Sequence, residues 1–346
     1  MNIVVLAGGI STERDVSLIS GSMIYKALKA NGHRAIILDV YLGYEGDTTG
    51  IFDLEKDWSK EISSISEMNP DVSAIKAMRP DGDKNYFGPN VIALCQEADA
   101  VFLALHGVGG EDGKVQAVFD LMGIRYTGTG FTSAAMAMDK AITKDLFVAN
   151  GIPTPKGIVL TVSEDAKAAI GKVPYPCIIK ARNGGSSVGV TIATNDAEFL
   201  EGCRIAFTYD TVAVVEEYIK GREFSVAVLD GKALPVIEIA PKQGFYDYKN
   251  KYQSGNTVET CPADLPAEWS ERMQKHAEAA FRALRYQSYA RMDFMMRENG
   301  EMFCLEANTL PGMTPTSLLP QEAAAVGMDF NTLCETILQT AFREKE

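Results

Sequence analysis

The stretch Arg291–Asn308 reads RMDFMMRENGEMFCLEAN and has the pattern of two β-strands joined by a tight turn. The dipeptide Asn299-Gly300 at its centre is typical of a type I′ turn, because both residue types tolerate a positive φ. If these two residues form the turn, Glu298 pairs with Glu301, and the register of the whole hairpin follows.

Counting outward from this turn gives three further pairs, which are Met295 with Cys304, Asp293 with Glu306, and Arg291 with Asn308. Side chains alternate along a strand, so we expect all six on one face. The opposite face is apolar and is expected to lie on a core; it consists of Met292, Phe294, Met296, Phe303, Leu305 and Ala307. Like charges directly across a pair, with Cβ atoms about 5 Å apart, repel each other. A bound cation would remove that repulsion.

Carboxylate and amide oxygens without Cys or His favour a hard cation. Mg²⁺ in particular combines one or two carboxylates with phosphates and water. The hairpin therefore predicts a Mg²⁺ site and, with it, a nucleotide. The alternative is a solvent-exposed hairpin whose charged side chains form ordinary surface ion pairs and bind no metal. The apolar opposite face and the unusual loop Asn308–Ser317 that follows count against that alternative.

The composition describes a folded protein of several domains. A chain of 346 residues suits two or three domains of about 100–150 residues each. Hydrophobic content of 46% and charged content of 23% are ordinary globular values and exclude extensive disorder.

Charge and cysteine usage exclude several functional classes. A net charge of −13 argues against nucleic acid as a partner, because nucleic-acid backbones select for clustered Lys and Arg. The six Cys residues form no C-x-x-C pair, so neither a structural zinc site nor a disulfide framework is indicated. The chain opens on a predicted strand and has no apolar run of membrane-spanning length, so we expect a cytoplasmic protein with no membrane partner.

The first part alternates between strands and helices, which predicts an open parallel α/β sheet. The expected elements are strands at Ile3–Leu6, Ala35–Val40 and Ala100–Leu105, and helices at Val16–Asn31 and Val115–Met122. The polar stretch Tyr41–Asn90 between them carries no motif that identifies its structure.

The remainder reads as α+β. A helix from Thr132 to Gly151 precedes a strand-rich segment, and a second hairpin turns at Asp230-Gly231. The other expected elements are strands Gly157–Thr161, Cys177–Lys180, Val188–Ala193, Val212–Glu217, Glu223–Asp230 and Ala233–Ile239, and helices Ala197–Ala206, Ala267–Leu284 and Asp329–Phe342. We place domains at residues 1–128, 129–216 and 217–346.

Residues 178–190, IIKARNGGSSVGV, predict a strand, a glycine-rich turn and a second strand. Glycines let backbone N–H groups surround an anion, and Lys180 and the serines add donors. The segment is not a Walker A loop, since G-x-x-x-x-G-K-[ST] is absent. A plain hairpin loop is the alternative reading.

Four segments together resemble the D-alanine–D-alanine ligase family of the ATP-grasp superfamily. They are Gly8–Leu18 (GGISTERDVSL), His106–Gly113 (HGVGGEDG), Gly185–Gly189 (GSSVG) and Glu306–Thr314 (EANTLPGMT). The resemblance covers nearly the whole chain and is weakest over Tyr41–Asn90. It implies an N-terminal open parallel α/β sheet followed by a two-part ATP-grasp fold, with ATP between the second and third domains.

The resemblance also implies roles for individual residues toward the nucleotide and metal. Asp293, Glu306 and Asn308 would hold two Mg²⁺, with Mn²⁺ as a substitute. Groups expected to contact ATP are Lys140, Lys180, Ser186, Ser187, Val188, Gly189, Glu216, Glu217, Tyr218, Ile219, Glu223, Lys251 and Met295.

The reaction implied by the resemblance joins two D-alanine molecules through an acyl phosphate, for peptidoglycan precursor synthesis. Glu13 would bind the first ammonium with His106 nearby, and Ser317 and Leu318 would receive the second carboxylate. The remaining catalytic groups are Ser186 and Tyr252, linked to Glu13, and Arg291 and the Gly312 N–H, which would bind the oxyanion. Taken alone, Glu13 also suits a helix N-terminus, and His106 an ordinary buried histidine.

Three alternatives stay open. The chain could instead make D-alanyl-D-serine, could make D-alanyl-D-lactate, or could be a silent ATP-binding regulator. Tyr252 favours the dipeptide over the lactate product, since the family has Phe there in lactate-forming members. The regulator would be expected to lack one of Arg291, Asp293, Glu306 or Asn308, and all are present. A homodimer is expected from the resemblance.

Overall fold

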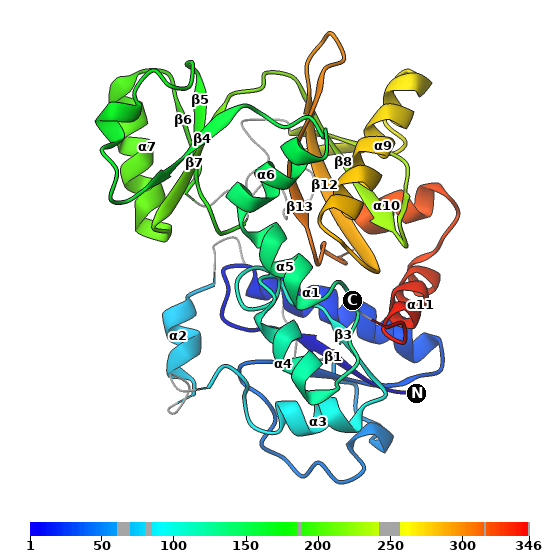
Figure 1. The fold of residues 1–346 in the computed structure, drawn as a ribbon. Coiled ribbons are helices and arrows are strands. Elements are labelled where there is room, and N and C mark those ends of the chain that lie inside the picture. The colour runs from blue at the N-terminus through cyan, green and yellow to red at the C-terminus, as the bar shows by residue number, and fades with distance from the viewer. Residues whose placement is uncertain (61–69, 80–84, 186–188, 242–256, 315, 345–346) are drawn as a thin grey trace.

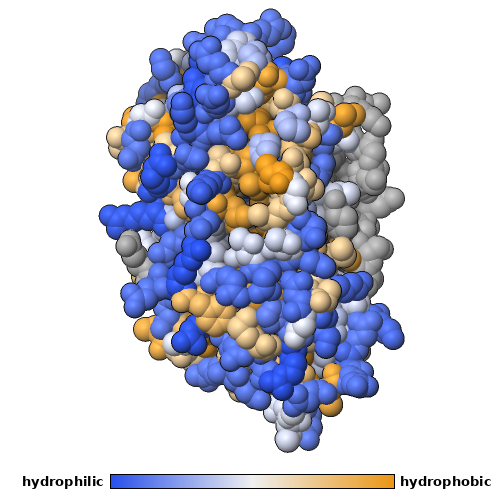
Figure 2. Space-filling model, turned by 90° about the vertical axis from the view of Figure 1, so that its right-hand side faces the viewer, coloured by the Kyte–Doolittle hydropathy of each residue, from blue (hydrophilic) through white to orange (hydrophobic). Residues whose placement is uncertain are grey.

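The computed structural model describes the chain except for residues 61–69, 80–84, 186–188, 242–256, 315 and 345–346. The described residues form three β-sheets, one in the N-terminal part and two in the rest (Figure 1). On the face drawn in Figure 2 polar side chains cover most of the surface, and apolar ones gather in the upper half.

The N-terminal sheet is parallel, as predicted, with strand order β2-β1-β3. Its strands are β1 (Asn2–Ala7), β2 (Arg34–Asp39) and β3 (Ala100–Leu103), and its helices are α1 (Arg14–Ala30), α3 (Val91–Glu97) and α4 (Lys114–Met122). Ile3 to Ala7 are fully buried, as expected for a parallel strand covered on both faces. The loops that follow β1 and β3 therefore emerge at the same edge of the sheet.

The stretch Tyr41–Asn90 contributes a short 3₁₀ helix, η1 (Ile51–Asp53), and one short α-helix, α2 (Val72–Ala77), among its described residues. Ile51 and Trp58 are buried in the hydrophobic core of the N-terminal sheet. This stretch is therefore part of the N-terminal core.

The prediction of a single helix from Thr132 to Gly151 is wrong, because the helix is interrupted at Asp139. Helix α5 (Phe131–Met138) ends there and α6 (Lys140–Ala149) begins. The Asp139 backbone is extended at φ −83° and ψ 101°, and its carboxylate accepts hydrogen bonds from the N–H groups of the first turn of α6. A capping aspartate therefore competes successfully with helix continuation.

The second sheet is antiparallel, with strand order β4-β7-β5-β6. Its strands are β4 (Gly157–Thr161), β5 (Cys177–Ala181), β6 (Thr191–Ala193) and β7 (Val212–Glu217), accompanied by η3 (Ala166–Ala169) and α7 (Asp196–Tyr209). Helix α7 covers one face through Phe199, Cys203 and Ala206. The predicted strand Val188–Ala193 is shorter than expected, since β6 begins at Thr191.

The third sheet has the order β11-β10-β8-β12-β13, with β9 also pairing with β8. Its elements are β8 (Arg222–Leu229), β9 (Lys232–Ala233), β10 (Ile237–Pro241), β11 (Thr257–Thr260), α9 (Ala267–Ala283), β12 (Tyr289–Met296) and β13 (Met302–Asn308). The predicted hairpin turn at Asp230-Gly231 is confirmed, and both residues have a positive φ, of 54° and 75°. The predicted strand Ala233–Ile239 is split into β9 and β10, and Pro235 in the interruption has no N–H to donate.

The turn of the Arg291–Asn308 hairpin differs from the prediction. The pairing of its strands away from the turn, at Asp293 and Glu306, agrees with the prediction. Arg297 N donates to Glu301 O, so the loop has three residues, and only Gly300 among them has a positive φ. This shifts the register by one residue, and a β-bulge that leaves Leu305 without a partner shifts it back. Asp293 therefore pairs with Glu306, as predicted.

Between the turn and the bulge the predicted pairs are wrong. Cys304 pairs with Phe294 and is fully buried, and Phe303 pairs with Met295 instead of facing the core. The apolar face packs on α9 and also on α5 and α6, which contribute Ala137 and Phe147 to the same core.

The C-terminal helices α10 (Leu318–Ala325) and α11 (Phe330–Thr340) return to the N-terminal part (Figure 1). Leu333 and Ile337 of α11 are buried in the core of the parallel sheet, against α1. The three-domain division at residues 128 and 216 remains a prediction. The packing shows that the last helices join the first sheet to the third.

We expect Gly300→Ala to lower the free energy of unfolding by about 1–3 kcal/mol. A Cβ at Gly300, where φ is 83°, would lie 2.6 Å from the Trp269 ring. Urea unfolding measures the change, with Glu298→Ala at an exposed position of the same loop as the control. Equal stability of both variants would contradict the assigned loop geometry.

Candidate active site

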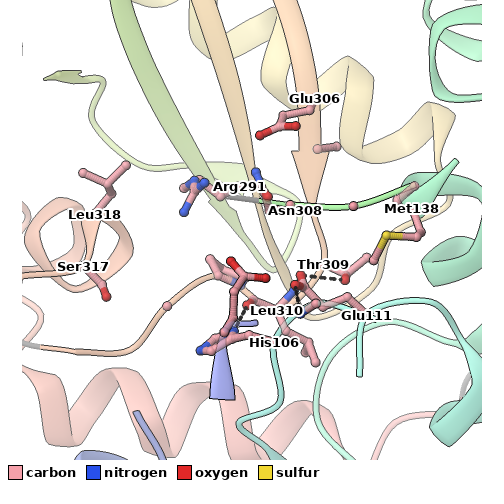
Figure 3. A pocket seen from close by; sticks show the side chains of 18 of the residues that line it. His106, Glu111, Met138, Arg291, Glu306, Asn308, Thr309, Leu310, Ser317 and Leu318 are labelled. Atoms are coloured by element: carbon pink, nitrogen blue, oxygen red, sulfur yellow. Dashed lines mark hydrogen bonds between the residues drawn. The ribbon is translucent and has the colours of Figure 1, made fainter. Parts of the chain in front are cut away.

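One pocket is lined by nine of the residues that the sequence singled out. Its walls come from the start of α1, the end of β3, the α5–α6 junction, the exit of β5, and the β12–β13 hairpin with the loop that follows it (Figure 3). The space between these walls is about 940 Å³ when its open mouth to solvent is included. The predicted site residues that line it are Glu13, His106, Lys140, Arg291, Glu306, Asn308, Gly312, Ser317 and Leu318.

The third sheet presents a row of polar side chains on its cleft face. Across β8 and β12, Arg291 pairs with Ala227, Asp293 with Ser225, and Met295 with Glu223. Across β12 and β13, Arg291 pairs with Asn308 and Asp293 with Glu306. The predicted metal ligands and the predicted nucleotide contacts therefore share one face.

Asp293 is buried and accepts hydrogen bonds from three neighbours. Arg291 binds it through Nε and a terminal nitrogen at 2.9 and 2.8 Å, Ser225 Oγ donates at 2.9 Å, and Asn308 Nδ2 donates at 3.0 Å. The predicted repulsion between Asp293 and Glu306 is therefore balanced on the Asp293 side by the Arg291 guanidinium. The Asn308 amide, oriented this way, leaves its oxygen available to another group.

Glu306 is half-buried in the pocket wall, and its carboxylate makes no hydrogen bond or ion pair with any residue that the structure describes. Figure 3 shows it reaching into the space beside Arg291 and Asn308. Within the described ranges no group of three or more His, Cys, Asp or Glu side chains is arranged to hold a metal. The candidate set is two carboxylates and one amide, and these oxygen donors fit Mg²⁺ when phosphates supply further ligands.

Glu13 lies at the N-terminus of α1 but makes no side-chain capping hydrogen bond there. A Cβ placed on Gly107 would come within 2.9 Å of Glu13 Oε2, and one on Gly185 within 3.2 Å. The carboxylate therefore lies between two loops at the pocket wall, where its charge suits an ammonium group.

His106 uses both ring nitrogens within the protein. Nδ1 lies 2.9 Å from Leu310 O and Nε2 lies 3.2 Å from Ser20 Oγ. Burial lowers the pKa of His106, although the charge of Glu13 acts in the opposite direction. A neutral ring that donates from Nδ1 satisfies this environment, so His106 holds the Leu310 loop in place.

Glu111 is a site residue to which the sequence assigned no role. It accepts hydrogen bonds from Gly107 N at 2.8 Å, Leu310 N at 3.0 Å and Thr309 Oγ1 at 3.1 Å. It thereby joins the loop after β3 to the loop after β13. Its place in HGVGGEDG was the available signal, but nothing in the sequence names its distant partners.

Lys140 and Lys180, which are both expected to contact ATP, make different contacts within the protein. Lys140 Nζ donates to Gly184 O at 2.6 Å, which ties the start of α6 to the glycine-rich segment. Lys180 forms an ion pair with Glu216 at 2.9 Å. Lys144, which the sequence analysis passed over, shares this carboxylate at 3.3 Å.

The segment Glu216–Ile219, which is expected to contact ATP, is firmly attached to its surroundings. The Glu217 carboxylate accepts from Lys156 N at 3.0 Å and pairs with Arg297 at 3.2 Å. The N–H groups of Glu217 and Tyr218 donate to backbone carbonyls, and Ile219 is buried. The segment is thus anchored to the second sheet and, through Arg297, to the third.

The loop after β13 supplies the remaining predicted contacts. A Cβ at Gly312 would lie 2.7 Å from Ser317 Oγ, so a larger residue there would displace that hydroxyl. Ser317 Oγ accepts from Thr314 N at 3.0 Å, and the Leu318 side chain is buried. Any anion bound at the start of α10 would therefore meet its backbone N–H groups.

Several predicted site residues fall outside the described ranges, namely Ser186, Ser187, Val188, Lys251 and Tyr252. Gly189 is described, and a Cβ there would come within 2.8 Å of the Tyr209 ring. No helix in the part of the chain that the structure describes is both long and apolar enough to cross a bilayer.

The pKa of Glu111 predicts a pH-dependent stability. Burial, with the charge of Glu13, raises the pKa of this carboxyl to about 7, so its contribution is full at low pH and is lost as the pH rises through 7. Between pH 5 and pH 8 the wild type should lose on the order of 2 kcal/mol of unfolding free energy relative to Glu111→Gln. Urea unfolding at both pH values tests this, with Glu97→Gln as an exposed control. A difference independent of pH would contradict it.

Comparison with known proteins gives the family of the chain. The family model described as D-ala D-ala ligase N-terminus matches residues 2–129, and the one described as D-ala D-ala ligase C-terminus matches residues 146–339. The D-alanine–D-alanine ligase of Pediococcus pentosaceus is 43% identical over 98% of this chain and 97% of its own length. That of Lacticaseibacillus casei is 44% identical over 98% of this chain and 95% of its own.

Solved structures agree with this assignment. A Bacillus anthracis D-alanine–D-alanine ligase complexed with ATP has a TM-score of 0.76 and 33% identity, covering 99% of this chain and 97% of that one. The VanG D-Ala:D-Ser ligase from Enterococcus faecalis has a TM-score of 0.77 and 29% identity, covering 98% of this chain and 99% of that one. The chain belongs to the D-alanine–D-alanine ligase family and has its ATP-grasp fold.

Proposed function

We propose that this chain uses ATP to join two D-alanine molecules into D-alanyl-D-alanine, through an acyl phosphate, for peptidoglycan precursor synthesis. Proteins named D-alanine–D-alanine ligase match nearly the whole length of this chain. The observation that carries the proposal is the placement of Glu13 and Arg291 on walls of one pocket, with Glu306 and the start of α10 on the same pocket. An ammonium site, a carboxylate site and a phosphate-activating site are thereby combined.

In the first step Glu13 pairs with the ammonium of one D-alanine, and the carboxylate of that molecule attacks the γ-phosphorus of ATP. Bond formation yields the acyl phosphate and ADP. Holding the carboxylate in line removes the entropic part of the barrier. Lys140 and Lys180 provide positive charge for the phosphates, and Glu13, placed between Gly107 and Gly185, fixes the amino end.

In the second step the amine of another D-alanine attacks the acyl carbon and phosphate leaves. The charge on the carbonyl oxygen is stabilised by Arg291 and the Gly312 N–H, an oxyanion-hole arrangement. The second carboxylate is received at Ser317 and Leu318, where α10 begins. Because the Ser317 hydroxyl already bonds to Thr314, we assign the recognition mainly to backbone N–H groups.

Two Mg²⁺, replaceable by Mn²⁺, would be held by Asp293, Glu306 and Asn308 and would neutralise charge on the transferring phosphoryl group. Support comes from the donor set, since Glu306 has no partner in the described chain. When a cation binds, Asp293 would contact it in place of Arg291. The Arg291 guanidinium could then bind the acyl oxygen.

We assign the nucleotide to the cleft between the second and third sheets. Glu216, Glu217, Tyr218 and Ile219 would meet the adenine edge, Met295 would pack on its face and Glu223 would bind the ribose. Met295 and Glu223 are direct neighbours across β12 and β8, in support of adjoining roles. The segment Ser186–Gly189 and the residues Lys251 and Tyr252 are proposed to close over the phosphates.

D-alanyl-D-serine is the second candidate product. The Enterococcus faecalis D-Ala:D-Ser ligase matches with a TM-score of 0.77 across nearly the full chain, so the fold accommodates either product. D-alanyl-D-lactate and silent ATP binding are weaker candidates. The proposal also includes a homodimer in the cytoplasm, where ATP is available.

The deciding experiment offers the protein ATP, Mg²⁺ and a panel of D- and L-amino acids and hydroxy acids, and identifies products by mass spectrometry. D-alanyl-D-alanine as the main product supports the proposal. A dominant mixed dipeptide with D-serine, a depsipeptide, or no ATP-dependent product would replace it with one of the alternatives.

Glu306→Gln should lower ATP-dependent phosphate release by about 100-fold or more, because the metal site loses a charged ligand. The thermal unfolding midpoint should stay near that of the wild type, since this side chain has no partner among the described residues. Phosphate release is measured at saturating D-alanine. The control is Glu301→Gln, at an exposed residue directly before β13. Near-normal turnover in Glu306→Gln would remove the assigned metal role.

A further inference from the structure

Lys144 belongs to no part of the mechanism above, yet its ammonium group is enclosed beside Glu216, which is proposed to meet the adenine edge. Its side chain is 12% exposed, and Nζ lies 3.3 Å from Glu216 Oε1. Nζ also donates to the carbonyl of Pro155 and lies 3.4 Å from Thr154 Oγ1. Three contacts from two segments hold this lysine on α6 beside β7.

The Glu216 carboxylate depends on two lysines. Its side chain is only 3% exposed, and Lys180 lies 2.9 Å from the same oxygen that Lys144 approaches. Burial acts to raise the pKa of Glu216, but Lys180 and then Lys144 outweigh it and hold the pKa below its ordinary value. Glu216 is therefore a charged acceptor inside the protein.

The two lysines differ in what else they can bind. Lys180 lies on β5, directly before the glycine-rich segment, and is assigned to the phosphates. Lys144 is bound to the connection between α6 and β4 by Pro155 and Thr154, which lie just before the edge strand β4. When Lys180 contacts a phosphate, Lys144 remains as the counter-ion of Glu216.

We propose that Lys144 is a positioning residue that holds the Glu216 carboxylate as acceptor for the 6-amino group of adenine, and so sets the preference for an adenine nucleotide. This inference rests on the proposed role of Glu216 at the adenine edge. Lys144 itself touches neither the base nor the phosphates. A carboxylate accepts from the 6-amino group but opposes the 6-oxo group of hypoxanthine, since two acceptors then face each other.

The test compares ATP with inosine triphosphate, which carries a 6-oxo group in place of the amino group, by calorimetric binding to the full chain. Lys144→Met should reduce the ratio of ATP to inosine triphosphate affinity by roughly tenfold to a hundredfold, because a hydrogen bond to a charged group is weakened. Lys144→Arg should retain most of the ratio. Lys156→Met, at an exposed lysine in the connection between α6 and β4, is the matched control and should retain all of it.

A double-mutant cycle separates action through Glu216 from a general structural effect. In a Glu216→Gln background, Lys144→Met should change the affinity ratio less than twofold, because the group through which it acts is gone. Lys144→Gln provides a second uncharged variant if Lys144→Met does not fold. Thermal unfolding of every variant without nucleotide confirms which proteins are folded.

Equal losses of affinity for both nucleotides, or an unchanged ratio in Lys144→Met and Lys144→Gln, would overturn the inference while leaving the proposed function standing. A wild type that binds no ATP would instead remove the proposed function. A wild type without preference between the two nucleotides would remove the role of Glu216, and the inference with it.

Discussion

The active-site pocket depends on how the backbone of Leu310 is held. Its N–H donates to Glu111 at 3.0 Å and its carbonyl accepts from His106 Nδ1 at 2.9 Å, so residues of the N-terminal part bind both polar groups of one residue in the C-terminal part. Figure 3 shows these contacts at the base of the pocket. Because of them, Glu13 at the start of α1 and Arg291 of the third sheet line the same pocket.

The charges of the cleft are balanced unequally, which supports the proposed metal site. Asp293 is neutralised by Arg291, and Glu216 by Lys180 and Lys144. Glu306 has no such partner in the described part of the chain. A buried or half-buried carboxylate without compensation is unfavourable, so an external cation is the natural complement. The chain as a whole is acidic, with a net charge of −13.

Local sequence signals predicted elements well where a single interaction decides the conformation. The Asp230-Gly231 turn and the parallel first sheet followed from such signals. The prediction of one helix across Asp139 was wrong, because the capping hydrogen bonds of this residue outweighed a continuous helical pattern. The hairpin register was correct at Asp293 only because the three-residue loop at Gly300 and the bulge at Leu305 shift the strands in opposite directions.

The sequence by itself determined the chemical groups of the site and their spacing along each strand, because side-chain alternation depends only on neighbouring residues. It identified Asp293, Glu306 and Asn308 as one oxygen-rich face, and Arg291 beside them. Only the tertiary structure decided which distant groups meet that face. Glu111 and Lys144 act through partners far away in the chain, and contacts of that kind depend on how sheets pack, which no local pattern encodes.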